Sequence, residues 1–470
     1  MFERLDAVKP ALKKLVAALR GEFAYASVLA TAERCRSWRE SKNGINLSSS
    51  ALDGGDGFVI RVFDETGCAE YSINAFSEEM IPEIVREMRT RLSAERAALP
   101  KEIALMPTAI PDDAPASLKK EAKYEIDPIS LGDEAILKLI ARIREKGLAA
   151  ENVMDVICNV NYSAERKIFL SENRDLDESH MWTNAFVGAI GSRGEEIKES
   201  YKGYSILGGA ELLNEVENDI GEVTKRLNDL LGSEPMIPGE YECVCDPEVT
   251  GMIVHEAFGH GVEMDMFVKD RAQARQFIGE YVASPLVTMH DGSAVDECAT
   301  WAFDDEGTLT GDTVIIDKGV LRRGMCDTLS AARLGLRPTG NGRRESYERK
   351  AYTRMTNTYF EGGDSTMDEM IASIRYGFLL EEPTSGMEDP KNWGIQCMVN
   401  SAREIRDGKL TGRIFSPIVL TGYVPDLLKS VSMMGNKVAL FGGGYCGKGY
   451  KEWVKVSDGG ACMKARIRLG

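Results

Sequence analysis

The residues with the clearest chemical potential lie in one stretch, HEAFGHGVEMD, which runs from His255 to Asp265. The chain has only four histidines, and two of them, His255 and His260, fall here five residues apart. Glu256 follows the first of them directly. Imidazole is the commonest metal-binding side chain, and a glutamate beside a metal can take a proton from bound water. The stretch therefore predicts a metal site with His255 and His260 as ligands and Glu256 as a catalytic base.

The five-residue spacing of the histidines sets a condition on the local backbone. Residues 246–248 (Asp-Pro-Glu) predict a helix start, with an N-cap, a proline at the first position and a charge that suits the helix dipole. On a regular helix, side chains five residues apart point about 140° away from each other, so they could not share one ion. Glycines at 259 and 261 weaken the helix. We therefore predict a π-type bulge or a helix break between Glu256 and Gly261.

A third ligand is needed, because a catalytic zinc typically has three protein ligands and a water. The candidates are Glu263, Asp265, His290 and any of the ten cysteines. Cys446 stands out among the cysteines because it lies in a glycine-rich loop, residues 441–450, that could bring backbone close to a site. A thiolate there would be stabilised by a neighbouring cation. Spacing alone leaves the third ligand open, and His180 and His290 are expected to be structural or surface residues.

Composition and charge exclude several classes of protein. With 470 residues, 43% hydrophobic and 28% charged, the chain is typical of a globular protein of two to four domains. A formal charge of −17 argues against nucleic acid or an anionic membrane as the main partner. No apolar run approaches the length of a transmembrane helix, and the charged N-terminus is unlike a signal peptide. The scattered cysteines, none in a CxxC pair, predict reduced thiols and a cytoplasmic location.

The hydrophobic periodicity predicts helices joined by many strands. Turn signals predict hairpins at residues 317–319 (Asp-Lys-Gly) and 407–408 (Asp-Gly), and capping signals lie at Asp133 and at Thr366 with Glu369. The expected fold class is α+β, with an N-terminal α/β region of helices and short strands followed by a β-rich C-terminal metal-binding domain. The expected domains are 1–105 (α/β), 106–235 (α+β) and 236–470 (β-rich). The expected helices span residues 4–20, 77–98, 133–146, 211–231, 367–376 and 425–434, and strands are expected at 23–31, 34–40, 57–63, 68–73, 152–162, 167–171, 181–190 and 198–206.

Five motifs in a fixed order carry a resemblance to a known family. They are HEAFGHGVEMD, residues 304–307 (DDEG), 340–347 (GNGRRESY), 354–359 (RMTNTY) and 444–448 (GYCGK). The set resembles the TldD/PmbA family of metalloproteases, the modulators of DNA gyrase, over about residues 240–450. The intact metal motif is similar to the metal-bearing TldD-like members. One departure is that residues 449–451 (Gly-Tyr-Lys) stand where such chains typically have an acidic residue and Gly-Gln.

The resemblance implies a set of roles. His255, His260 and Cys446 would bind zinc, and Glu256 would be the base in hydrolysis of small or unfolded peptides. Family members bind the peptide as an added strand inside an enclosed cavity. The resemblance also implies a homodimer, or a heterodimer with a metal-free paralogue.

Two other functions and one group of residues stay open. A non-enzymatic zinc-stabilised protein that binds peptides or a partner subunit is the main alternative, and a fourth protein ligand, Glu263 or Asp265, would favour it. A redox enzyme using Cys243 and Cys245 lacks a CxxC pair or a dinucleotide loop. The remaining motif residues could bind substrate or could hold loops through buried ion pairs; they are Asp304, Asp305, Glu306, Arg343, Arg344, Arg354 and Asn357.

Overall fold

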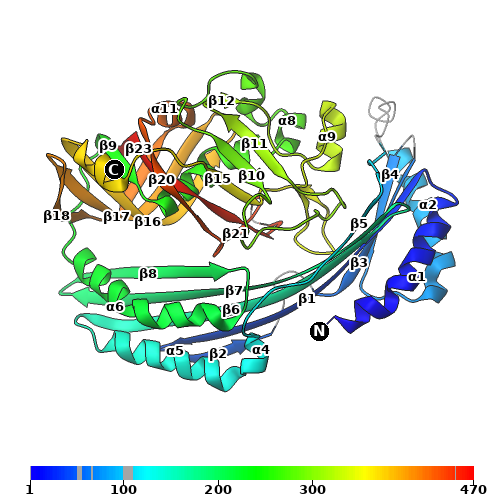
Figure 1. The fold of residues 1–470 in the computed structure, drawn as a ribbon, viewed down its shortest axis with the longest axis horizontal. Coiled ribbons are helices and arrows are strands. Elements are labelled where there is room, and N and C mark those ends of the chain that lie inside the picture. Colours follow the sequence, from blue (N-terminus) through cyan, green and yellow to red (C-terminus); the bar gives the residue numbers. More distant parts are fainter. Residues whose placement is uncertain (1, 50–54, 65–66, 99–109, 450) are drawn as a thin grey trace.

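The computed structural model describes residues 2–49, 55–64, 67–98, 110–449 and 451–470. It has two parts, a long curved sheet formed within residues 25–206 and a β-rich C-terminal body from residue 239 onward. The C-terminal body lies over the concave side of the sheet (Figure 1). The expected α+β fold class is confirmed. None of the described helices combines the length and apolar composition that a bilayer crossing requires.

The curved sheet has the strand order β4-β3-β1-β6-β7-β5, with β2 beside β1 and β8 beside β7. Side chains alternate along a strand, so Val28 and Ala30 of β1 pack under helices, whereas Leu29 packs with Phe303 of the C-terminal body. The sheet is therefore buried on both faces where the two parts meet. Its strands are β1 (Tyr25–Ser41), β2 (Gly44–Ser48), β3 (Gly57–Asp64), β4 (Gly67–Ile73), β5 (Ala116–Lys120), β6 (Val153–Leu170), β7 (Arg174–Arg193) and β8 (Glu196–Ile206).

The helices of the N-terminal part form two groups, with α1 and α2 at one end of the sheet and α5 and α6 at the other (Figure 1). The four helices expected here are confirmed, but the predicted cap at Asp133 is wrong. Gly132 is the N-cap residue, because the Asp133 carboxylate instead accepts hydrogen bonds from Arg36 and Trp38 of β1. The helices are α1 (Glu3–Arg20), α2 (Ile81–Ala98), α4 (Pro128–Leu131), α5 (Asp133–Leu148) and α6 (Leu213–Leu230), with 3-10 turns at Glu78–Met80 and Ala210–Leu212.

The strands of this sheet are longer than the sequence pattern indicated. The runs at 23–31 and 34–40 form one strand, β1, and the four runs within 152–206 form three. Residues 163–166 (Ser-Ala-Glu-Arg) do not form a turn, because they pair with β1 on one side and β7 on the other. Arg166 is buried there against Asp177, at 2.9 Å, which satisfies its charge. Cross-strand ion pairing thus replaces the apolar pattern that the prediction required.

The expected domain boundaries are only partly accessible. The boundary at 105/106 lies outside the described residues. Strands on both sides of it, β1 and β6, pair within one sheet. The boundary at 235/236 falls between α6 and β9, at the passage from the curved sheet to the C-terminal body. The division into three domains stays a prediction.

The C-terminal body is built on a sheet ordered β12-β11-β10-β15-β23-β19-β17-β16-β9. Because β9 also pairs with β23, the strands β23, β19, β17, β16 and β9 close into a barrel. Its strands are β9 (Gly239–Cys245), β10 (Met289–Gly292), β11 (Asp312–Asp317), β12 (Val320–Leu321), β13 (Gly342–Arg343), β14 (Tyr352–Thr353), β15 (Asn357–Phe360), β16 (Tyr376–Asp389), β17 (Gly394–Arg406), β18 (Lys409–Phe415), β19 (Ile418–Tyr423), β20 (Met433–Phe441), β21 (Tyr445–Cys446), β22 (Val454–Lys455) and β23 (Ser457–Leu469).

Local signals in this half are mostly confirmed. The predicted hairpins join β11 to β12 and β17 to β18, and the capping box of Thr366 and Glu369 begins α10. The helix expected at 425–434 is too long, because residues from 433 onward pair with β23 as β20. The helices are α7 (Pro247–Met252), α8 (Asp265–Val268), α9 (Thr328–Leu334), α10 (Met367–Ala372) and α11 (Val424–Lys429), with a π-helix at Ile253–Gly259 and 3-10 turns at His260–Val262 and Gln273–Phe277.

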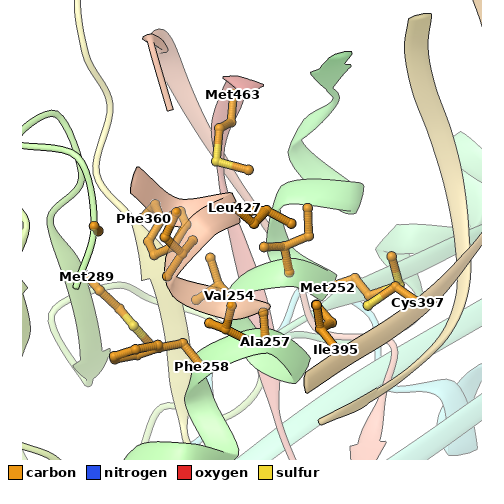
Figure 2. Packing of buried hydrophobic residues seen from close by; sticks show 14 of the residues in the cluster. Met252, Val254, Ala257, Phe258, Met289, Phe360, Ile395, Cys397, Leu427 and Met463 are labelled. Carbon is orange, nitrogen blue, oxygen red and sulfur yellow. The ribbon is translucent and has the colours of Figure 1, made fainter. Parts of the chain in front are cut away.

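The motif helix is held by the largest apolar cluster. Val254, Ala257 and Phe258 are fully buried, and Figure 2 shows them among side chains from several strands, Met289, Phe360 and Ile395 among those labelled. Because this side of the helix is packed, the opposite side, which carries the histidines, faces the curved sheet.

The close packing of α7 on β23 gives a test of the fold. A Cβ at Gly251 would lie 2.8 Å from the Cα of Gly459. Gly251→Ala is expected to lower the free energy of unfolding by about 1–3 kcal/mol through overpacking, measured by urea unfolding. Gly221→Ala in α6 is the control, because open space surrounds Gly221 and alanine favours a helix. Equal stability of both variants would contradict the close approach.

Candidate metal centre

The motif helix begins as the sequence predicts and then changes its winding. Asp246 caps α7 by accepting a hydrogen bond from the backbone N–H of Val249, and Pro247 takes the first position. The helix then continues as a π-helix over Ile253–Gly259 and a 3-10 turn over His260–Val262. The backbone hydrogen bonds of a π-helix join residues five apart, so side chains at that spacing lie on nearly the same side of it. The predicted bulge between Glu256 and Gly261 is therefore confirmed.

The altered winding brings the histidines together with one cysteine. Ligand atoms of His255, His260 and Cys446 all lie within 4.8 Å of one another. Nε2 of His260 is 3.4 Å from the Cys446 sulfur, and the two imidazole rings are 5.1 Å apart and nearly perpendicular. Cys446 comes from the short strand β21, 186 residues after His260. Among the described residues, this is the only such cluster of potential metal ligands.

The donor set fits a zinc ion. Zinc with tetrahedral Zn–N and Zn–S bonds places nitrogen and sulfur about 3.6 Å apart, close to the observed 3.4 Å. Burial opposes ionisation of Cys446, but the imidazoles of His255 and His260 hold the pKa of the thiol well below its usual value. A thiolate is the form that binds metal. Two imidazoles and one thiolate leave the fourth tetrahedral position for water or substrate.

Glu256 lies at the open side of this cluster. Its Oε2 is 3.9 Å from Nε2 of His260, and its side chain packs against β16, where a Cβ at Gly386 would be 2.4 Å from its Cγ. Burial raises the pKa of Glu256, with His255 and His260 acting in the opposite direction. A carboxyl group with a raised pKa is better suited to hold a proton between two steps of a reaction.

The other acidic candidates for the third ligand have different partners. Glu263 accepts from Nε of Arg354 at 3.2 Å and from Nζ of Lys448 at 3.0 Å, and it lies 3.4 Å from Nδ1 of His260. Asp265 accepts from Lys448 at 2.7 Å. Neither carboxylate is part of the ligand cluster; both bind the cationic side chains around it. Glu263 orients the His260 ring so that Nε2 faces the cluster.

A buried guanidinium completes this arrangement. Arg354 is fully buried, and its Nη2 donates to the carbonyl oxygen and to the sulfur of Cys446, both at 2.9 Å. Burial alone would raise the pKa of Glu263, but Lys448, His260 and Arg354 together hold it far below its ordinary value. The chain therefore surrounds the thiolate and both imidazoles with charges of compensating sign.

Loss of the Glu263 charge should be costly. Glu263→Gln leaves the fully buried Arg354 without its carboxylate and Lys448 with Asp265 alone, so the free energy of unfolding is expected to fall by about 3–5 kcal/mol at neutral pH. Urea unfolding measures the change. The control is Glu234→Gln, which removes an exposed ion pair with Arg413 and should cost about 1 kcal/mol or less. Equal effects of the two substitutions would show that the buried ion pairs of Glu263 contribute no more to stability than an exposed ion pair.

Three of the remaining motif residues hold the two parts of the molecule together. Lys167 of β6 donates to Asp305 at 2.8 Å, Arg61 of β3 pairs with Glu306, and Arg344 donates to Glu70 of β4. The other members of this group bond within the C-terminal body: Asp304 accepts from the N–H of Gly342, Arg343 donates to the Met355 carbonyl, and Asn357 donates to Thr300 and the Gly292 carbonyl. His180 contacts Glu178, and His290 lies between Asp312 and Glu361.

Two carboxylates near the ligands could not be anticipated from the motif. Asp458 of β23 lies 3.7 Å from Nδ1 of His255, a buried nitrogen without a hydrogen-bond partner among the described residues. Glu388 of β16 accepts from the backbone N–H of Gly261 at 2.8 Å. Neither sequence neighbourhood contains a signal for these contacts, because both depend on strand positions far from the motif.

The cluster opens into a large cleft between the curved sheet and the C-terminal body. The cleft has a volume of about 820 Å³ and is lined by His255, Glu256 and Asp458 on one side. Asn184 of β7 and Tyr201 of β8 line the other side. This volume is typical of a site for a small molecule or a short peptide, and a folded protein could not enter it.

Comparisons with known proteins agree on one family. Residues 238–457 match the PmbA/TldA metallopeptidase C-terminal domain. A metalloprotease of Methanothermobacter thermautotrophicus is 31% identical over 318 residues, which cover 67% of this chain and 69% of the relative. A zinc metalloprotease TldD homolog of Saccharolobus solfataricus is 29% identical over 260 residues, 54% of this chain and 57% of the relative.

The fold is also shared with solved structures. A modulator of DNA gyrase from Thermotoga maritima superposes with a TM-score of 0.79 over 98% of this chain and 100% of the other, at 16% identity. At this identity the likeness concerns the fold alone. It extends over both the curved sheet and the C-terminal body.

Proposed function

The chain belongs to the TldD/PmbA family of metallopeptidases, and from that premise we propose that it is a zinc metallopeptidase acting on small or unfolded peptides. The observation that carries the proposal is the convergence of His255, His260 and Cys446, with Glu256 beside them, at the wall of a large cleft. Three protein ligands with an open position are typical of catalytic rather than structural zinc.

The chain's own residues account for the rest of the chemistry. His255, His260 and Cys446 would hold zinc, which when bound supplies the Lewis acidity that polarises a peptide carbonyl and acidifies water. Glu256 takes the proton of the attacking water on its carboxylate and later passes that proton to the leaving amine. Arg354 and Glu263 hold the thiolate and the His260 ring in position through the contacts described above.

The shape of the cleft supports the choice of substrate. The site is reached through a cleft of about 820 Å³ between the curved sheet and the C-terminal body, which suits an extended, thin substrate better than a folded one. Polar side chains of the curved sheet face the motif helix across it, Asn159 and Asn161 among them. Such groups can bond to the backbone of an extended peptide whatever its side chains are.

Metal analysis combined with an activity assay tests this function. The purified protein is expected to contain one zinc per chain and to cleave an unfolded peptide, and removal of zinc by a chelator should abolish cleavage until zinc is restored. A folded protein of the same composition is the control substrate and should resist. A protein that holds zinc and binds the peptide without cleaving it would instead be the non-enzymatic binding protein.

The family premise also leads us to propose a dimer, either of two copies or with a metal-free paralogue. Light scattering of the purified chain distinguishes the two forms. A homodimer has twice the mass of the chain, whereas a chain that needs a paralogue stays monomeric and gains activity when the paralogue is added.

A further inference from the structure

A second, smaller cavity lies between the curved sheet and the C-terminal body. It has a volume of about 80 Å³, and its walls include three tryptophans, Trp182, Trp301 and Trp453. Lys455 of β22 and Glu165 of β6 also line it. Neither the metal ligands nor Glu256 lines this cavity. The cavity thus combines aromatic walls with several charged side chains, Lys455 and Glu165 among them.

Lys455 is the unusual member of this group. It is only 6% exposed, and its ammonium has no hydrogen-bond partner among the described residues. The positive charge is instead stabilised by the ring faces of Trp182 and Tyr445, whose centres lie 4.5 and 5.0 Å from Nζ. Burial lowers the pKa of Lys455 to about 8. A buried cation without a hydrogen bond is costly, so it calls for a partner from outside the chain.

Glu165 faces the same cavity and is also unpaired within the described residues. Burial raises the pKa of Glu165 to about 8. The nearby cations are already engaged, because Lys167 donates to Asp305 at 2.8 Å and Arg343 donates to the Met355 carbonyl at 2.6 Å. No ion pair joins Glu165 to Lys455 among the described residues, so the Glu165 carboxyl, which burial keeps largely protonated at neutral pH, and the Lys455 ammonium remain apart in one cavity.

We propose that this cavity binds a small α-amino acid, with its carboxylate on Lys455 and its ammonium on Glu165. The carboxylate of a bound zwitterion would compensate Lys455, while its ammonium would favour the ionised form of Glu165 and release the Glu165 proton to solvent. The tryptophan faces also favour an ammonium group beside them. A phosphate would meet only one free cation among several carboxylates, and a metal ion would be repelled by Lys455. The cavity has about a tenth of the volume of the cleft beside the metal ligands, so it favours glycine or alanine over a large amino acid.

The proposed site lies behind the ribbon that carries the cysteine ligand. Lys455 pairs with Tyr445 across β21 and β22, and Cys446 pairs with Val454. Successive side chains point to opposite faces of such a ribbon, so Lys455 and Cys446 face opposite ways. The amino-acid site is therefore separate from the metal centre. The proposal of this site does not depend on the protein being a peptidase.

Calorimetric titration of the full-length, zinc-loaded protein tests the proposal with three probes. Glycine is expected to bind once per chain with a Kd of about 10 μM to 1 mM, within the range open to so small a ligand. Acetate, which carries only the carboxylate, should bind at least about 10-fold more weakly, and methylammonium should not bind measurably. Absence of saturable glycine binding would overturn the proposal.

Two substitutions separate this cavity from chelation at the metal. Lys455→Met and Glu165→Gln are each expected to weaken glycine binding by about 10-fold or more, through loss of a charge-assisted hydrogen bond. Lys451→Met is the control, because Lys451 is half exposed and does not line the cavity. Lys455→Met removes an unpaired buried charge, so its thermal midpoint should not fall. Unchanged glycine binding in both cavity variants would place the amino acid elsewhere and overturn the assignment.

Discussion

Glu256→Gln is expected to lower the rate of peptide cleavage by about 10²–10⁴-fold while leaving zinc in place. The amide has the size of the carboxylate but cannot take a proton from the attacking water. It removes no metal ligand, since only His255, His260 and Cys446 have ligand atoms in the cluster. The measurements are kcat with an unfolded peptide and the zinc content per chain.

Glu248→Gln is the matched control for this experiment. Glu248 lies on α7, lines the same cleft and is also a carboxylate, but it precedes the ligands by two turns of the helix. Its substitution should leave turnover within a few-fold of the native rate. Native turnover in the Glu256→Gln variant would remove Glu256 from the reaction, and loss of zinc in that variant would make it a structural support of the site instead.

Cys446→Ala is expected to weaken zinc binding by more than 100-fold. Loss of a residue that only hydrogen-bonds to a ligand typically weakens metal affinity by about 10–100-fold, and loss of the ligand itself should cost more. It also leaves Arg354 without the sulfur that its Nη2 contacts at 2.9 Å. Competition with a coloured chelator measures the affinity. Cobalt substitution provides a second readout, since the sulfur-to-cobalt charge-transfer absorption should disappear in the variant.

The control for this second experiment is Cys462→Ala. Cys462 is a buried cysteine of β23 that belongs to a different apolar cluster. Its loss should change stability slightly and zinc affinity not at all. If Cys446→Ala bound zinc as tightly as the native protein, the third ligand would have to come from another side chain. Asp458 would then be a candidate, because its carboxylate lies 3.7 Å from Nδ1 of His255.

Local signals predicted what depends on neighbouring residues. The cap at Asp246, the capping box at Thr366, the hairpin turns and the change of helix winding near Gly259 are all set by atoms a few residues apart. The winding could be inferred because only a π-type turn or a break lets two histidines five residues apart face the same ion. The predicted cap at Asp133 was wrong because the Asp133 carboxylate accepts a hydrogen bond from the distant Trp38 side chain and not from the backbone of its own helix.

The sequence by itself determined that two histidines and a glutamate form a candidate metal site on an irregular helix, and the order of its motifs indicated the family. It could not determine from spacing which of ten cysteines would be the third ligand. That choice belongs to the tertiary structure, because His260 in a helical turn and Cys446 on β21 are 186 residues apart in sequence and meet only through packing. The same holds for Lys455 and Glu165, whose shared cavity exists only where the curved sheet meets the C-terminal body.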